Sequence, residues 1–341
     1  MQKTQALVLL LAAYAAATWI PSPGLRLREL NLLGSSINPP ELLLAGLLLC
    51  AGLCSSPGTL RTILSARSRF IISSIASWML PLLAAAVTVA VLWGIAGCPP
   101  QVALGVVIVA AMPVANSSVG WSTTMRGSIA LSIALLVVGT ALSPLLTPLA
   151  ISAGAISLRT AEDSLMNTPW SQGMGGFFVT WVLAPVLLGV FLSGRMSEQV
   201  RKWVVPWSRR VSFVILILLN YLNGVPCLPS LAEQPSLLQW PVLGASCLLL
   251  LSYAANRGLT LWLRAFMPTA ESLPPEQISQ MLSVVMRNTG AALVFAGAAL
   301  PEFVSLSLTI IAYTMLQHLW AGACLAASTH SLDNAIAKEL R

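Results

Sequence analysis

The chain has 341 residues, of which 57% are hydrophobic and 9% are charged, and its formal net charge at pH 7 is +7. Soluble domains carry about 25% charged residues. This chain therefore lacks the polar side chains that a water-exposed surface needs, which excludes a large soluble protein. The basic residues are scattered over short loops and form no patch with interleaved aromatic side chains, so we expect no nucleic-acid partner.

Apolar runs of membrane length recur from one end of the chain to the other and predict an all-α polytopic membrane protein. We expect ten transmembrane helices, with approximate bounds 5–20, 41–56, 72–93, 103–121, 128–151, 175–193, 211–225, 237–257, 279–300 and 303–327. The first run follows Lys3 and contains AAYAAA, so it could instead be a secretory signal peptide.

The basic residues fall mainly into one of the two sets of loops that ten spans define. Only Arg26, Arg28 and Arg159 lie in the other set. Because short cytoplasmic loops carry the excess of Lys and Arg, this distribution predicts that both termini are cytoplasmic. We therefore expect an integral protein of the inner or plasma membrane.

Two of the expected spans are interrupted by polar and helix-breaking residues. The fourth span contains MPVANSSVGWSTT at 112–124, and the ninth contains MRNTG at 286–290. The interruptions lie 172 residues apart, measured from Asn116 to Asn288, which is about half of the chain. Each half holds five spans, an odd number, so the second half should run inverted relative to the first. We expect repeats at 1–170 and 171–341, as in secondary transporters whose interrupted helices meet at the substrate site.

Unwound backbone inside a bilayer persists only where it is buried in protein or lines a water-filled cavity. The half-helices that begin after the two interruptions would offer free N–H groups and a positive dipole end to an anion. The alternative is that Pro113 and Gly290 merely kink two packing helices, with the nearby hydroxyls bonded back to the backbone.

Three stretches of the chain resemble the bile acid:sodium symporter family. GVVIVAAMPVANSSVGWSTTMRGSIALSIALLVVGTALSPLLTP at 105–148 is similar to that family's first crossing motif, while MRNTGAAL at 286–293 and QHLWAG at 317–322 resemble its second crossing helix and final span. The resemblance implies ten helices in a panel domain and a core domain, with the fourth and ninth helices broken and crossing. It also implies sodium-driven transport of organic anions, such as bile acids and smaller carboxylates.

The resemblance implies sodium ligands at positions where this chain has changed residues. Ser118 and Ser132 keep ligand hydroxyls. The family's asparagine beside the first of them falls on Val119, and a threonine one turn after the second falls on Leu136. The first crossing therefore retains only part of the implied ligand set.

In the second crossing the family's acidic ligand falls on Ser283 and its glutamine ligand on Arg287, while a third-span glutamine falls on Ala76. No Asp or Glu lies deep in a span, so the chain has no buried carboxylate for sodium or for a proton relay. A bound cation would also repel Arg287 at short range. Sodium coupling of the family's usual kind is therefore doubtful, and no other cofactor or metal is expected. We regard as remnants of the ion sites Ser118, Ser132, Ser283 and Met286.

Arg287 would lie about 12 Å inside a hydrocarbon core about 30 Å thick if 279–300 is a helix. An arginine at such depth costs about 2.5–3.5 kcal/mol on the insertion scale, which indicates a function. We expect its guanidinium to take the place of sodium and to fork onto a carboxylate-bearing substrate. The alternative is structural: the guanidinium donates to carbonyls of the broken helix and locks the crossing without touching a ligand.

The candidate substrate-binding residues are Arg287, Asn288, Thr289, Asn116, Ser117 and His318. By the resemblance, Asn288 matches an asparagine that lines the family's substrate cavity. Asn116 and Ser117 could instead cap the half-helix that follows them. His318 could carry a proton, since the pKa of a free imidazole is about 6.5. It could instead be a neutral histidine hydrogen-bonded between helices.

These observations favour a secondary transporter of small organic anions that works by alternating access, with Arg287 in place of sodium. Two alternatives stay open: a conventional sodium-coupled symporter with displaced ligands, and a non-transporting receptor or scaffold of the same fold. An enzyme is not expected, because no nucleophile–base–acid set can be drawn within the spans.

Overall fold

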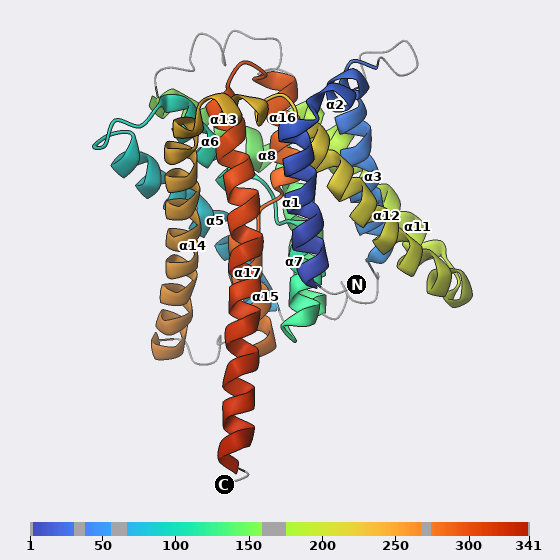
Figure 1. The fold of residues 1–341 in the computed structure, drawn as a ribbon. Coiled ribbons are helices and arrows are strands. Elements are labelled where there is room, and N and C mark those ends of the chain that lie inside the picture. The colour runs from blue at the N-terminus through green and yellow to red at the C-terminus, as the bar shows by residue number, and fades with distance from the viewer. Residues whose placement is uncertain (1–2, 31–37, 56–66, 159–174, 267–273, 340–341) are drawn as a thin grey trace.

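The computed structural model describes residues 3–30, 38–55, 67–158, 175–266 and 274–339. Within these ranges the chain is built from helices, turns and short extended segments, and it forms no β-strand (Figure 1). The predicted all-α class is confirmed. Continuous helices that coincide with expected spans are α1 (Lys3–Trp19), α3 (Pro39–Cys54), α5 (Arg67–Leu92), α8 (Ile129–Leu158), α12 (Glu198–Gly224), α14 (Gln239–Phe266) and α17 (Val304–Glu339). The sixth expected span is a π-helical segment, Phe178–Leu183, that continues into α11 (Ala184–Arg195).

Within the described residues six helical stretches are long and apolar enough to cross a membrane, and the number rises to seven if α1 and α2 (Pro21–Arg28) are counted as one bent span. Three shorter apolar helices, α3, α6 (Pro100–Ala111) and α16 (Thr289–Ala299), lie where the second, fourth and ninth spans are expected. These helices support a polytopic membrane protein. The number of ten spans stays a prediction.

Several helix boundaries differ from those read from hydropathy. Helices α8, α14 and α17 end 7, 9 and 12 residues after the expected positions 151, 257 and 327. The segment after the first span is not a plain loop, because α2 begins at Pro21 and meets α1 at an angle of 88°. Proline is well suited to the first turn of a helix, where its missing N–H has no intrahelical partner. Helix α12 starts 13 residues before the expected position 211. Its start is capped by Ser197, whose hydroxyl accepts a hydrogen bond from the Val200 N–H, and its early charged residues lower the local hydropathy without breaking the helix.

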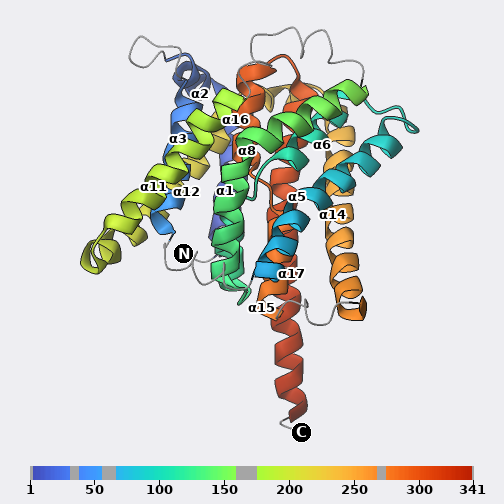
Figure 2. The ribbon, with the colours of Figure 1, turned by 180° about the vertical axis from the view of Figure 1, so that it is seen from behind.

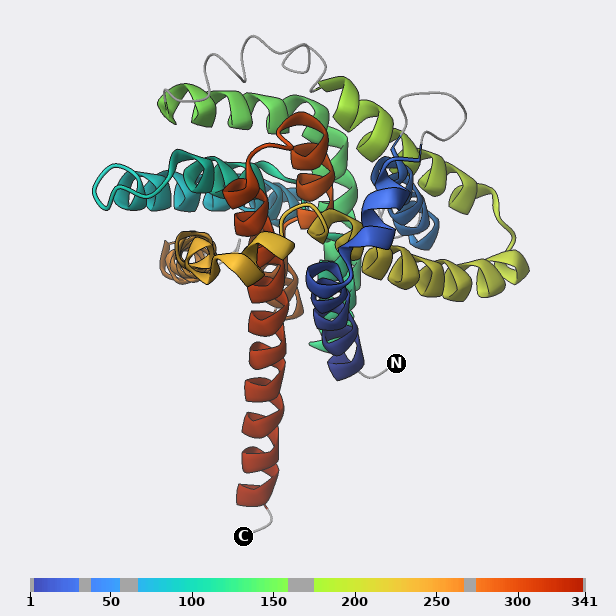
Figure 3. The same ribbon diagram turned by 45° about the horizontal axis from the view of Figure 1, so that its top comes forward.

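The helices form two groups that α16 joins. Helices α11 and α12 both pack on α3, and α1 packs on α12. Helices α5, α6, α14 and α17 form the other group, with α8 against α6. Figures 2 and 3 show these groups on opposite sides of the molecule, with the long helix α17 projecting beyond the rest. Helix α16 contacts α17 in one group and both α3 and α12 in the other.

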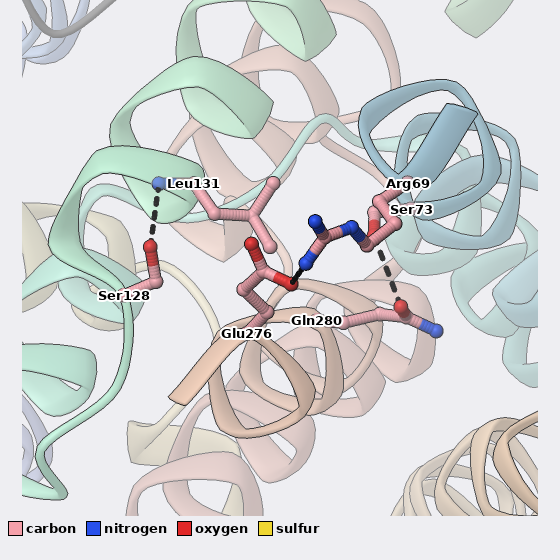
Figure 4. A network of polar contacts seen from close by, with 6 residues as sticks. All are labelled: Arg69, Ser73, Ser128, Leu131, Glu276 and Gln280. Carbon is pink, nitrogen blue, oxygen red and sulfur yellow. Dashed lines mark hydrogen bonds and ion pairs between the residues drawn. The ribbon is translucent and has the colours of Figure 1, made fainter. Parts of the chain in front are cut away.

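Helix α5 is tied to α15 (Pro274–Val285) by polar side chains near the start of each helix (Figure 4). Arg69 forms an ion pair with Glu276 at 2.9 Å. One turn further on, the Ser73 hydroxyl donates to the Gln280 side-chain oxygen at 3.0 Å, and the Gln280 amide donates to Asn256 of α14 at 3.1 Å. These bonds hold α15 in register with α5 and therefore position the residues that follow α15.

Helices α3 and α11 approach closely at two glycines. A Cβ atom on Gly52 would lie 2.3 Å from the Val186 carbonyl oxygen and 2.8 Å from the Gly189 Cα. A Cβ atom on Gly189 would lie 2.4 Å from the Leu49 carbonyl oxygen. Small residues permit such contact between helix backbones, which is how membrane helices gain packing energy where lipid offers little hydrophobic driving force.

We predict that Gly52→Ala destabilises the protein, because the added methyl group meets backbone atoms that cannot move aside. Overpacking of this kind costs about 1–3 kcal/mol, and thermal unfolding in detergent should show a midpoint lowered by about 2–6 °C. The matched control is Gly258→Ala in α14, where no atom lies within 4 Å of the new Cβ. Equal midpoints for the two variants would show that α3 and α11 do not pack this closely.

Candidate functional site

Two pairs of helices end and begin at one place in the interior. Helix α6 ends at Ala111 and α7 (Asn116–Thr124) begins five residues later, while α15 ends at Val285 and α16 begins at Thr289. The backbone of Met112 and Ala115 is extended between the first two helices. Pro113, which lacks an N–H group, removes a donor that a continuous helix would need.

The two interrupted segments satisfy each other's backbone. Val114 and Arg287 form an isolated antiparallel bridge. The Ala115 N–H donates to the Met286 carbonyl at 2.9 Å, and the Asn288 N–H donates to the Pro113 carbonyl at 2.9 Å. Because unpaired backbone groups are costly away from water, this mutual pairing explains how both segments persist inside an apolar protein.

Helix α17 completes the backbone pairing of the second segment. The Gln317 side-chain oxygen accepts from the Arg287 N–H at 3.0 Å, and the Tyr313 hydroxyl donates to the Val285 carbonyl at 2.6 Å. Gln317 also donates to the Thr289 hydroxyl at 3.4 Å. Sequence reasoning missed the roles of Tyr313 and Gln317, although two polar residues four apart in an apolar span were a signal for them.

The Arg287 side chain is fully buried, with 0% exposure, and its guanidinium lies among backbone carbonyls. Nη1 donates to the carbonyls of Ser77 at 2.6 Å and Ser283 at 3.3 Å. Nη2 donates to the carbonyl of Ala110 at 3.2 Å and to that of Met112. Within the described ranges Arg287 forms no ion pair with a carboxylate, and backbone carbonyls accept the hydrogen bonds of its guanidinium.

Each of these carbonyls is available because a helix ends or is interrupted nearby. Ala110 and Met112 lie at the end of α6, and Ser283 lies in the last turn of α15, where carbonyls lack intrahelical donors. Ser77 lies in the middle of α5, but the residue four positions later is Pro81, which has no N–H to donate to it. The negative ends of the α6 and α15 dipoles therefore both point at the guanidinium, an arrangement that favours a cation.

The opposite ends of the broken helices face a cavity of about 460 Å³. The starts of α7 and α16 line it, together with residues of α3, α8, α12 and α17. None of the lining residues that the structure describes is Asp or Glu. Helix N-termini beside a cavity that holds no carboxylate form a suitable environment for an anion.

Five of the six candidate substrate-binding residues bring polar side chains to this cavity, namely Asn116, Ser117, Asn288, Thr289 and His318. The Asn288 side chain also caps α16 by accepting from the Ala291 N–H at 3.1 Å. His318 Nδ1 accepts from the Trp121 indole N–H at 3.2 Å, a bond that joins α17 to α7 and matches the alternative of a neutral histidine.

The sixth candidate, Arg287, borders the cavity, but its guanidinium is turned into the carbonyls described above. Its hydrogen bonds match the structural alternative, in which the guanidinium donates to carbonyls and locks the crossing without touching a ligand. They leave no exposed pair of N–H groups for a carboxylate. The Nε atom has no hydrogen-bond partner among the described residues, and the guanidinium carbon lies 5.7 Å from the centre of the Trp78 ring. The arrangement combines a fixed cation with a structural lock.

The predicted remnants of the ion sites are fully buried, and none of them lines the cavity. The Ser132 hydroxyl lies 2.6 Å from that of Ser122, which lies 3.0 Å from that of Ser279. The Ser283 hydroxyl donates to the Ser279 carbonyl at 2.8 Å. The Ser118 hydroxyl is buried and has no partner within the described ranges.

Met286, the fourth predicted remnant, is fully buried and packs in a small apolar cluster with Ala115 and Leu282. Its carbonyl, rather than its thioether, makes the polar contact of this residue, by accepting from the Ala115 N–H. Across the described ranges no group of three His, Cys, Asp or Glu side chains is arranged to hold a metal ion.

We predict that Arg287→Gln strongly destabilises the protein, because the shorter amide cannot reach carbonyls of three helices. Leaving several buried acceptors unpaired costs about 1–3 kcal/mol for each, so the thermal midpoint of the purified protein should fall by many degrees. Arg257→Gln is the matched control, because Arg257 is an exposed arginine on α14. If both variants unfold at the wild-type temperature, the guanidinium does not lock the crossing.

A family model described as the sodium bile acid symporter family matches residues 41–226, more than half of the chain. The match runs from α3 through both helices of the first crossing and all of α12. A search among curated proteins finds no match. The apolar helices, the paired interruptions and this match lead to one conclusion: the chain is a transmembrane transporter that belongs to the sodium bile acid symporter family.

Proposed function

We propose that this protein is a secondary transporter that moves small organic anions by alternating access, and that Arg287 replaces bound sodium so that transport is independent of sodium. The observation that carries the proposal is the fully buried guanidinium of Arg287, held by carbonyls at the ends of α6 and α15. Membership of the family supports the transport of organic anions in general.

The surroundings of Arg287 support its role as a resident cation. Carbonyl oxygens and helix C-termini are groups that would favour a sodium ion, and the guanidinium occupies them permanently. A metal ion at the same place would meet a positive charge at short range and lose those oxygens to the arginine's hydrogen bonds. The residues at the implied sodium positions Ser283, Val119 and Leu136 supply no anionic group.

The cavity supports an anionic substrate. It is lined by the N-terminal turns of α7 and α16 and by the amide and hydroxyl groups of Asn116, Ser117, Asn288 and Thr289. Its volume of about 460 Å³ falls in the range of small-molecule sites, which is about 300–1,000 Å³. We assign these residues to substrate binding, with Ser118, Ser132, Ser283 and Met286 as remnants of former ion sites.

The fold suggests how access would alternate. We propose ten spans in two inverted repeats, 1–170 and 171–341, with α6–α7 and α15–α16 as the broken fourth and ninth spans. The group of α3, α11 and α12 would form the panel domain, and the group of α5, α6, α14 and α17 the core domain. With both termini in the cytoplasm, rocking of one group against the other would expose the cavity to each side in turn.

We predict that anion uptake does not require sodium. Proteoliposomes that contain the purified protein should take up radiolabelled cholate at the same rate in sodium medium and in choline medium, and protein-free liposomes give the background. A rate that falls severalfold in choline would instead identify a conventional sodium symporter with displaced ligands. Cholate binding without uptake in either medium would identify a receptor or scaffold.

We also predict that the double variant Ser283→Glu, Arg287→Gln regains a response to sodium, because it restores a carboxylate and removes the competing cation. Sodium at about 100 times its dissociation constant should raise the stability of this variant by about 2.7 kcal/mol. Thermal unfolding in sodium against choline chloride measures the effect, with the wild type and the Arg287→Gln variant as controls. If sodium shifts the wild type as much as the double variant, Arg287 does not stand in for the ion.

A further inference from the structure

One face of α12 forms a wall of the cavity. Arg209, Ser212, Phe213, Leu216 and Asn220 line it, at intervals of three or four residues that place them on a single side of a helix. Asn220 marks one end of this face, where the neighbouring Leu219 lies beside α16, 3.5 Å from a Cβ built on Gly290. Arg209 marks the other end, eleven residues earlier, so the two ends are separated by about 16 Å along the helix.

Arg209 lines this cavity, and its guanidinium interacts with the Cys54 thiol at the end of α3. It is exposed, and it makes no ion pair within the described ranges. Arg287, the other arginine of the lining, is fully buried and engaged with carbonyls.

The other arginines near Arg209 on α12 are engaged elsewhere. Arg201 donates to the Ser55 carbonyl at 3.2 Å and to the Ser193 hydroxyl at 3.3 Å. Arg210 lies over the Trp207 ring at 5.6 Å and does not line the cavity. Arg209 therefore differs from both neighbours in lining the cavity.

The wall between the two ends of the cavity is apolar. Leu47, Leu48 and Ala51 of α3 contribute apolar side chains to it, together with Phe213 and Leu216 of α12. The Cys54 thiol, at the end of α3, donates to the Val205 carbonyl at 4.0 Å, one turn before Arg209. The cavity thus has a polar end at the crossing, an apolar middle and a cationic end at Arg209.

We propose that Arg209 binds the anionic head of the substrate, and that the rest of the substrate lies between Arg209 and the start of α16. This inference rests on the proposed function, because it assigns the head-group contact within the same cavity. A guanidinium offers a carboxylate or sulfonate two parallel hydrogen bonds. Arg287 then keeps its role as the lock of the crossing, and a different arginine recognises the cargo.

Binding to the wild type and to two variants tests the assignment. Protein in nanodiscs is titrated by calorimetry with cholate and decanoate, each compared with its uncharged methyl ester. We expect Arg209→Gln to weaken binding of both anions about tenfold and to leave the affinity for the esters unchanged. Arg210→Gln is the matched control and should bind all four probes as the wild type does.

The outcomes separate the inference from the proposed function. If the wild type binds the anions and Arg209→Gln keeps the same preference for anion over ester, Arg209 does not bind the head group. If neither anion binds saturably to the wild type, the proposed function itself is contradicted and the inference falls with it. A loss of ester binding in Arg209→Gln would assign to this residue a packing role and would also overturn the inference.

A second measurement needs no substrate. In a variant that keeps Cys54 as its single cysteine, the thiol is labelled with an anionic or a cationic methanethiosulfonate of similar size. A guanidinium beside the thiol should favour the anionic reagent, and Arg209→Gln should lower the ratio of the two rates by about fivefold. Arg210→Gln should leave the ratio unchanged. An unchanged ratio in Arg209→Gln would show that this arginine does not set the potential in the cavity.

Discussion

The pairing of two interrupted backbone segments around one buried arginine is the constraint on which the rest of this structure depends. A membrane interior offers no water to unpaired N–H and C=O groups, so an interruption in a helix needs an internal partner. The segments at 112–115 and 286–288 provide that partner for each other. Arg287 donates hydrogen bonds to carbonyls that remain at the ends of α6 and α15. Pro81 contributes to the same design, because it frees the Ser77 carbonyl in the middle of α5.

This arrangement separates the electrostatic tasks of the site. The negative ends of α6 and α15 point at a resident cation, while the positive ends that begin α7 and α16 point into the cavity. In the proposed function the guanidinium, which cannot dissociate, would stabilise the crossing in place of a soluble ion. In the proposed transport cycle the substrate anion would then be recognised by the helix starts and by Arg209, without drawing Arg287 out of its carbonyls.

Much of the architecture could be predicted from hydropathy. Exposing polar side chains to lipid is costly, so membrane-spanning segments can be recognised as apolar runs in the sequence. Helices occur at all ten expected positions within the described residues, and both interruptions lie where Pro113 and the Arg287–Gly290 cluster predicted them. The differences are local. Helix α2 and the early start of α12 were missed, because proline at a helix start and charged residues in a first turn lower hydropathy while still favouring helix. The contact of Gly52 with Gly189 depends on helix rotation, which hydropathy does not encode.

For the site, the sequence alone determined the residue types: a deep arginine, two polar interruptions half a chain apart and no Asp or Glu deep in an expected span. Those properties follow from the chain's own chemistry and from the expense of placing polar groups in a bilayer. Only the tertiary structure decided where the arginine points. Carbonyls from α5, α6 and α15, which are distant in the chain, converge on Arg287, while Arg209 of α12 is left facing the cavity. Partners contributed by separate helices are set by packing and register, so they emerge only when the helices are assembled.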